Sequence, residues 1–262
     1  MRILPVGFLF LVTAVCFNNC VGTSDLAAEI NQRKFSLSIF SYSVTDFQVH
    51  AYYEPGAEPY VGSLGLLGGD IWDITEQSYI ALFQNHPGRT VTVPRTLGDM
   101  TALSAQNTSN WSPKALVQLG TSIAAPWIQG NQIHLSVIFL NGYYQGNPNV
   151  LGVQISGNPF AFVFKDAIQG VGGTSTDQHY AEQAVTVHEL GHVVGLVNLG
   201  VPLARPHQDS GHPGHSNNSA CVMYWSVESA QNILASVAHF IGTGRKDLFG
   251  PEALQDGRSF HP

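Results

Sequence analysis

The sequence predicts an α+β fold: a twisted mixed sheet with helices packed on it, followed by a small, mostly irregular and helical C-terminal subdomain. Its first two thirds alternate strand-like apolar runs with segments of helical period, separated by turns rich in glycine and proline. After Gly195 the chain is rich in proline, glycine and histidine and loses this periodicity. With 262 residues, 44% of them hydrophobic and 11% charged, the chain is long enough to bury a sizeable core.

Four segments are predicted along the chain. Residues 1–20 combine an early arginine with an apolar run, which is typical of a signal peptide, and Cys20 at its end is a candidate for lipid attachment to a membrane. Residues 21–33 are predicted as a tether or a short first helix, 34–196 as the N-terminal subdomain with the sheet and the active-site helix, and 197–262 as the C-terminal subdomain. The protein is therefore expected to be exported, in secreted, periplasmic or envelope-anchored form.

Charge and cysteine content exclude some classes of protein. The net charge is −7 and no cluster of five or more basic residues occurs, so no nucleic-acid partner is expected. After removal of the leader, Cys221 and at most Cys20 remain, so no internal disulfide framework is predicted. We expect a monomer.

Strands are predicted where apolar and polar residues alternate, or where apolar residues run together between turn signals. The run QIHLSVIFL at 132–140 is almost wholly apolar in its second half and predicts a central buried strand. Weaker patterns predict further strands at 35–42, 47–53, 91–93, 150–156 and 160–165.

Helices are predicted from apolar residues at helical spacing and from capping residues. Ser112-Pro113 places a capping serine directly before a proline and predicts a helix from there to about residue 125. The same spacing predicts helices at 72–85, 177–196 and 225–242, and a last short turn of helix within 247–254.

The strongest chemical signal is the sequence His188-Glu189-Leu190-Gly191-His192. Histidines four residues apart leave the same face of a helix, about one turn from each other, and together can bind one Zn²⁺. A glutamate beside them can take a proton from a zinc-bound water. A catalytic zinc site needs a third protein ligand, which this helix does not supply.

The stretch around this motif resembles the metzincin clan of metallopeptidases, whose pattern is His-Glu-x-x-His-x-x-Gly-x-x-His followed by a methionine-containing turn. His188, Glu189, His192 and Gly195 match that pattern, but Asn198 stands where the third histidine is expected. The resemblance also covers 150–153, which is similar to the edge strand on which metzincins bind an extended substrate. An ordinary edge strand is an equally good interpretation of that segment.

Four residues compete for the third ligand position. The segment 215–223 is similar to the archaemetzincin pattern His-Cys-x4-Cys-x-Met, with Ser216 in place of the first cysteine. This resemblance favours His215 as the ligand and Met223 as the methionine of the turn, after an insertion at 198–214. Archaemetzincins bind a second, structural zinc through cysteines, but Ser216 replaces one of these and no cysteine pair follows, so no second zinc is expected. The remaining candidates are His207, His212 and Asn198.

Glu228 is a further candidate, as the later glutamate that a gluzincin-like site would use. The Met223-Tyr224-Trp225 segment argues against that interpretation. The resemblance therefore implies one catalytic Zn²⁺ held by His188, His192 and His215.

The activity implied is hydrolysis of peptide bonds in a protein or peptide substrate by a zinc endopeptidase, through a metal-bound water with Glu189 as general base. The alternative is an exported metzincin-like binding protein with little or no hydrolytic activity. Asn198 in place of the third histidine of the metzincin pattern favours this alternative, whereas the presence of Glu189 favours the enzyme.

Overall fold

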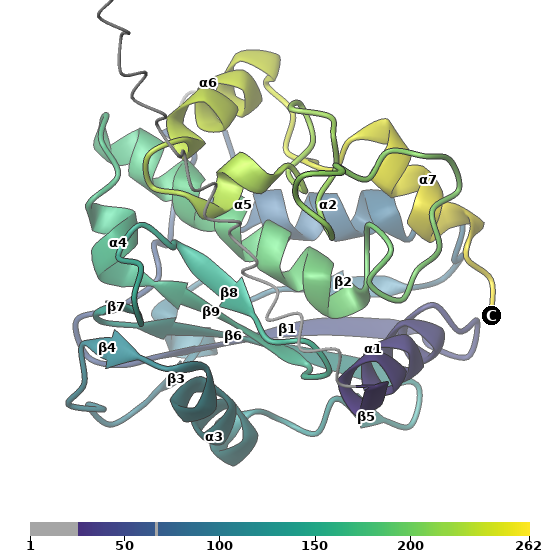
Figure 1. Ribbon diagram of the computed structural model, residues 1–262, viewed down its shortest axis with the longest axis horizontal. Helices are drawn as coiled ribbons and strands as arrows, with labels where there is room; N and C mark the ends of the chain where they lie inside the picture. Colours follow the sequence, from purple (N-terminus) through teal and green to yellow (C-terminus); the bar gives the residue numbers. More distant parts are fainter. Residues whose placement is uncertain (1–25, 66–67) are drawn as a thin grey trace, which may run out of the picture.

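The computed structural model describes residues 26–65 and 68–262 (Figure 1). Its helices are α1 (Leu26–Ile39), α2 (Asp73–Leu82), α3 (Pro113–Ile123), α4 (Lys165–Gln169), α5 (Ser175–Val194), α6 (Ile233–Thr243) and α7 (Pro251–Ser259), with the 3-10 helices η2 (Leu97–Asp99) and η3 (Trp225–Glu228). Its strands are β1 (Asp46–Tyr53), β2 (Thr90–Thr92), β3 (Thr101–Ala102), β4 (Asn110–Trp111), β5 (Ile128–Gln129), β6 (Gln132–Leu140), β7 (Tyr143–Tyr144), β8 (Gly152–Gln154) and β9 (Phe160–Phe164).

The main sheet is mixed, which confirms the predicted fold class. Its strand order is β2-β1-β6-β9-β8, with β3 paired to β1 and β5 to β6. Strands β2, β1, β6 and β9 run parallel to one another, whereas β8 runs antiparallel to β9. The run predicted as a central strand is β6, whose side chains are buried from the second residue onward. Strand β8 is the edge beside which the long helix α5 lies (Figure 1).

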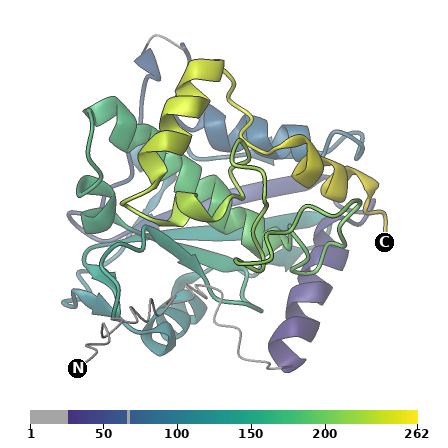
Figure 2. The ribbon, with the colours of Figure 1, turned by 45° about the horizontal axis from the view of Figure 1, so that its top comes forward.

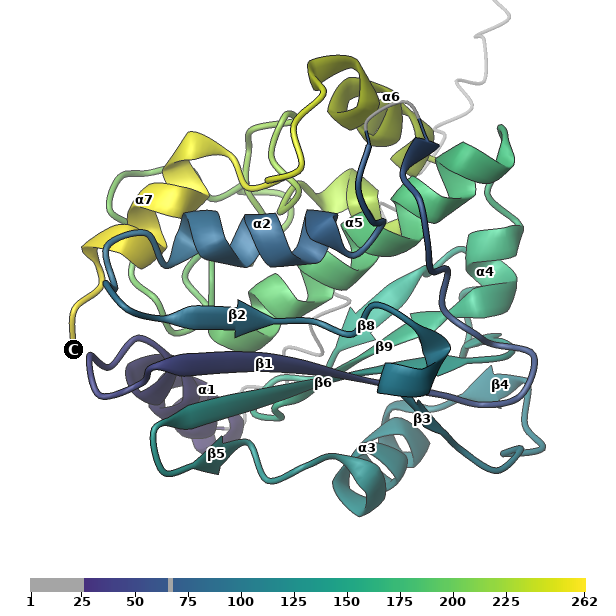
Figure 3. The same ribbon diagram turned by 180° about the vertical axis from the view of Figure 1, so that it is seen from behind.

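Helices cover the sheet unequally. Helices α5, α2, α6 and α7 lie on one face, and α3 lies on the other (Figures 1 and 3). On the more heavily covered face, the ring of Phe47 from β1 stacks on Tyr79 from α2 with centroids 4.9 Å apart. None of the helices in the described part of the chain combines the length and apolarity needed to cross a membrane.

Helix α5 lies two residues before the predicted range, at Ser175–Val194 instead of 177–196. Thr174 accepts a hydrogen bond from the Asp177 N–H, and the Asp177 carboxylate accepts one from the Thr174 N–H, so the two residues form a capping box. Gly195 ends the helix with φ 92°, a left-handed conformation that glycine adopts without steric cost. All residues from Tyr180 to Val194 are buried, so this helix is the centre of the molecule.

The first helix corrects one prediction. The sequence predicts a strand at 35–42, but α1 occupies 26–39, so of the two interpretations of 21–33 the helix describes residues from 26 onward. The prediction of a strand is wrong because the alternation of apolar and serine residues at 35–39 also fits one face of a helix. That face docks on α5: Gln32 donates to the carbonyls of His192 and Val193, and Ser36 donates to the carbonyl of Val194. Helix α1 thereby satisfies carbonyl groups that the end of α5 would leave without partners.

The C-terminal part is irregular, as expected, between α5 and η3. Residues 198–220 contain no helix or strand in the described chain, and they run beside the C-terminal half of α5 and α7 (Figure 2). The helix predicted at 225–242 is split into η3 and α6, and the last predicted turn of helix is the longer α7. The predicted signal peptide at 1–20 and the lipid attachment at Cys20 lie outside the described residues.

Candidate metal centre

Helix α5 places two histidine side chains together in the interior. His188 and His192 leave the same face of the helix one turn apart, with 0% and 1% of their surfaces exposed. Their Nε2 atoms are 2.9 Å apart, and the two rings are almost perpendicular. Two ring nitrogens at this separation can share one metal ion.

The tautomer of His188 follows from its second nitrogen. Nδ1 lies 2.6 Å from the carbonyl oxygen of Val222, which can only accept a hydrogen bond. Nδ1 must therefore carry a proton, so Nε2 is the nitrogen that the neutral imidazole can offer to a metal ion. An imidazole fixed in this way by a backbone carbonyl is typical of metal-binding histidines.

His215 reaches the pair from the irregular loop. Its Nε2 points at the same spot, its ring stacks on His188 with centroids 5.3 Å apart, and only 2% of its surface is exposed. Backbone hydrogen bonds hold this part of the loop: the carbonyl of His215 accepts from Asp209 N–H at 2.8 Å, and Ser216 N–H donates to the carbonyl of Met223 at 2.8 Å.

The three competitors of His215 lie elsewhere. His207 pairs with the carboxylate of Asp256 at 2.7 Å. His212 stacks flat on Trp225, with ring centroids 4.5 Å apart. Asn198 has φ 67°, and its side chain donates to Gln208. Of the four candidates, the structure brings only His215 to His188 and His192.

Glu228, at the end of η3, completes the cluster. Its Oε1 atom lies 3.0 Å from Nε2 of His188, 3.3 Å from Nε2 of His192 and 3.0 Å from Nε2 of His215. The ligand atoms of these four buried residues all lie within 4.8 Å of one another, so the group could hold a metal ion. Sequence reasoning considered Glu228 and His215 as alternatives, whereas the structure brings both to one point.

The donor set fits zinc. Nitrogen and oxygen ligands about 2.05 Å from a tetrahedral zinc ion are about 3.3 Å from each other. The separations between Nε2 of His188 and of His192, and between Oε1 of Glu228 and each imidazole, are 2.9 to 3.3 Å. Imidazole nitrogens with a carboxylate oxygen are also ordinary zinc ligands, so both the chemistry and the spacing of the cluster suit this metal.

Glu189 lies beside the histidines, against the edge of the sheet. It is fully buried. A Cβ atom on Gly152 of β8 would come within 2.8 Å of its Cγ, so glycine leaves the room in which this side chain lies. Burial, followed by the negative charge of Glu228, raises the pKa of Glu189 well above its usual range.

The ionisation of the cluster is set by Glu228. Burial alone would raise the pKa of this carboxyl, but the charge of His215 and hydrogen bonds from the three histidines hold it well below its usual range. Burial lowers the pKa of His192 to about 3. Burial would also lower the pKa of His215, but the Glu228 carboxylate raises it. In the metal-free protein the negative charge of Glu228 is therefore stabilised mainly by the positive charge of His215.

Met223 lies under the site, where the resemblance places the methionine of the turn. It is wholly buried, and its Sδ atom would be 2.4 Å from a Cβ atom on Gly191. Gly191 lies between the two histidines on α5, so the absence of its side chain lets the methionine pack directly against the helix backbone.

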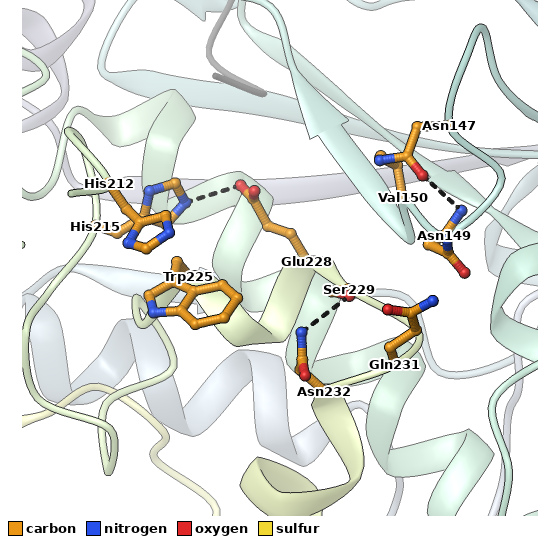
Figure 4. A pocket seen from close by; sticks show the side chains of 10 residues that line it. All are labelled: Asn147, Asn149, Val150, His212, His215, Trp225, Glu228, Ser229, Gln231 and Asn232. Atoms are coloured by element: carbon orange, nitrogen blue, oxygen red, sulfur yellow. Dashed lines mark hydrogen bonds and ion pairs between the residues drawn. The ribbon is translucent and has the colours of Figure 1, made fainter. Parts of the chain in front are cut away.

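A small pocket opens beside the cluster. His212, Trp225 and the outer sides of His215 and Glu228 form one wall, and Asn147, Asn149, Val150, Ser229, Gln231 and Asn232 form the rest (Figure 4). Figure 4 shows the Glu228 carboxylate pointing toward His215, with which it makes a hydrogen bond. The pocket provides a route from solvent to the cluster.

Comparison with known proteins finds only distant likenesses. No family model and no curated protein sequence matches the chain. Among solved structures, it is similar to archaemetzincin from Methanopyrus kandleri, with 15% identity over 83% of this chain and 95% of that one and a TM-score of 0.46. It is also similar to archaemetzincin from Archaeoglobus fulgidus complexed with malonate, with 17% identity over 80% and 99% of the two chains and a TM-score of 0.42. The assignment of a function therefore depends on the geometry of the site.

Proposed function

We propose that this protein is an exported zinc-dependent endopeptidase of metzincin-like type, acting on protein or peptide substrates. The observation that carries this proposal is the convergence of three buried imidazole Nε2 atoms, from His188, His192 and His215, beside the buried carboxylate of Glu189. Three histidines with an adjacent glutamate are the groups that hydrolysis assisted by zinc requires.

Each residue has a distinct task in this mechanism. His188, His192 and His215 would hold one zinc ion, and Met223 supports them from below. Zinc, when bound in such a site, lowers the pKa of a coordinated water and polarises the scissile carbonyl. Glu189 accepts the proton of the attacking water and delivers it to the leaving amine.

Replacing the proton acceptor tests this proposal. Glu189→Gln keeps the size of the side chain and touches no ligand, so it should bind zinc with wild-type stoichiometry. Because the amide cannot accept the proton, its turnover should be at least about 100-fold slower, the usual contribution of general acid–base catalysis. Cleavage of a mixed peptide library, followed by mass spectrometry, measures the rate, and elemental analysis measures the zinc.

Glu252→Gln is the matched control. This carboxylate lies in the same subdomain and accepts a hydrogen bond from Asn218, away from the three histidines. It should cleave the library at the wild-type rate. Unchanged turnover in Glu189→Gln would contradict the role of Glu189 as general base.

One observation favours the second function, an exported binding protein that keeps the fold without hydrolysis. Glu228 stands at the position that an attacking water would need, because its Oε1 contacts all three imidazoles. A site with four protein ligands is typical of structural rather than catalytic zinc. Zinc binding by the wild-type protein without cleavage of any library peptide would support this second function.

A further inference from the structure

We propose that Glu228 is a fourth protein ligand of the metal, so that the resting centre is closed by three histidines and one glutamate. This inference rests on the proposed zinc site and deepens it, because it defines the state of the centre before a substrate arrives. A catalytic zinc site keeps one ligand position open for water, and in this protein the side chain of Glu228 takes that position.

The contacts of the carboxylate support ligation. Oε1 of Glu228 is almost equally distant from the three Nε2 atoms, at 3.0, 3.3 and 3.0 Å. These separations are close to the edge, about 3.3 Å, of a tetrahedron of nitrogen and oxygen ligands around zinc, so the Glu228 carboxylate is near enough to the three histidines to bind the same ion. A carboxylate that served only as an outer partner would instead face Nδ1 of one histidine, as second-layer carboxylates do.

The backbone around Glu228 is held in place by the sheet edge. We call residues 228–230 the strap. Leu151 N–H donates to the carbonyl of Glu228 at 3.0 Å, and Ala230 N–H donates to the carbonyl of Asn149 at 2.9 Å. Val150 and Ser229 thus form an antiparallel bridge. These hydrogen bonds hold the backbone of Glu228 at a position from which its side chain reaches the three histidines.

The strap also occupies a part of the sheet edge to which an extended substrate would bind. An extended peptide binds to a sheet edge through the N–H and carbonyl groups of the edge strand. Immediately before β8, the N–H of Leu151 and the carbonyl of Asn149 already bind the strap. The side chain of Glu228 therefore takes the fourth ligand position of the metal. The backbone of the strap at the same time takes the neighbouring edge of the sheet. The pocket of Figure 4 borders Glu228 on its other side and provides space into which the carboxylate can turn.

Anion binding to the cobalt-substituted protein tests this proposal, because the visible spectrum of Co²⁺ reports a change of ligand whether or not the protein hydrolyses anything. In the wild-type protein, azide should leave the spectrum unchanged, since no position is open. In Glu228→Ala, azide should bind at least about tenfold more tightly and change the spectrum. Zinc affinity, measured by competition with a chromophoric chelator, should fall at least about tenfold, as after loss of other groups that support a metal.

Two further variants complete the test. Glu228→Gln keeps the shape of the side chain with a poorer ligand and should show the same direction of change, so a folding defect of Glu228→Ala does not decide the result. Glu252→Gln removes one charge from the same subdomain and should behave as wild type. Equal azide binding by wild type and Glu228→Ala would overturn the proposal while leaving the zinc site and the proposed function standing. Absence of metal binding in all variants would instead refute the zinc site itself.

Discussion

Two buried histidines of the same loop, His207 and His215, have opposite surroundings. Each is 2% exposed, and each faces a carboxylate: Asp256 at 2.7 Å for His207 and Glu228 at 3.0 Å for His215. His207 forms a pair that links the loop to α7. His215 joins a cluster in which one carboxylate oxygen meets three imidazoles. Burial and a carboxylate partner are therefore not enough to identify a metal ligand.

The difference lies in how the remaining polar atoms are used. Both ring nitrogens of His207 have partners, because Nδ1 lies 3.2 Å from Oγ of Ser216 while Nε2 faces Asp256. The other oxygen of Asp256 accepts from Ala204 N–H at 2.7 Å. This pair is complete without a metal. In the His215 cluster three ring nitrogens share one oxygen. This convergence of several ring nitrogens on one point distinguishes the metal site from the structural pair.

The largest effect should come from His215→Ala. Removal of one of three imidazoles should weaken zinc binding more than about 100-fold, beyond the usual effect of changing a group outside the ligand set. The fold should survive, because this part of the loop is held by hydrogen bonds of its backbone, which the substitution leaves in place. Competition with a chromophoric chelator measures the affinity. Wild-type affinity in this variant would mean that another residue is the third ligand.

His207→Ala makes the same chemical change nine residues earlier and should give the opposite pattern. Zinc affinity should stay within about threefold of wild type, since this residue does not contact the cluster. Stability should fall by about 3 kcal/mol, because the change leaves a buried carboxyl oxygen of Asp256 without its hydrogen-bond partner. Urea unfolding of the two variants side by side measures the difference. Loss of zinc from His207→Ala, with stability unchanged, would reverse the assignment of the two histidines.

A smaller effect is expected where the helix meets Met223. Gly191→Ala would place a Cβ atom 2.4 Å from the methionine sulfur, so Met223 must shift. Overpacking of this kind should cost about 2 kcal/mol in the free energy of unfolding. Gly242→Ala in α6 is the matched control, because nothing lies within 4 Å of its added Cβ atom, and it should gain about 0.5 kcal/mol. Equal stabilities of the two variants in urea would show that Met223 does not pack on α5 as described.

Much of the fold follows from local patterns. Strands β1 and β6 and helices α3 and α5 match their predicted positions because each has one dominant period or a clear cap. Helix α1 could not be predicted in the same way. Its apolar residues fit both periods, and the choice of helix depends on the docking of Gln32 and Ser36 on the end of α5, which is a contact between distant segments.

The residues of the site differ in the same way in how far the sequence predicts their position. His188, Glu189 and His192 lie on one helix, so the spacing of the sequence already places them on one face. His215 and Glu228 come from irregular chain, where no period relates sequence position to direction. The resemblance favoured His215 and treated Glu228 as its alternative. Only the path of the loop and of η3 shows that both reach the same point.

The most direct test of the central claim is the number of imidazoles bound to zinc, measured by X-ray absorption spectroscopy at the zinc edge. The zinc-loaded wild-type protein should show three histidine ligands, at about 2.0 to 2.1 Å. Zinc forced onto His215→Ala at high concentration should show two, and His207→Ala should keep three. Two imidazoles in the wild-type protein, or the loss of one in His207→Ala but not in His215→Ala, would contradict this assignment.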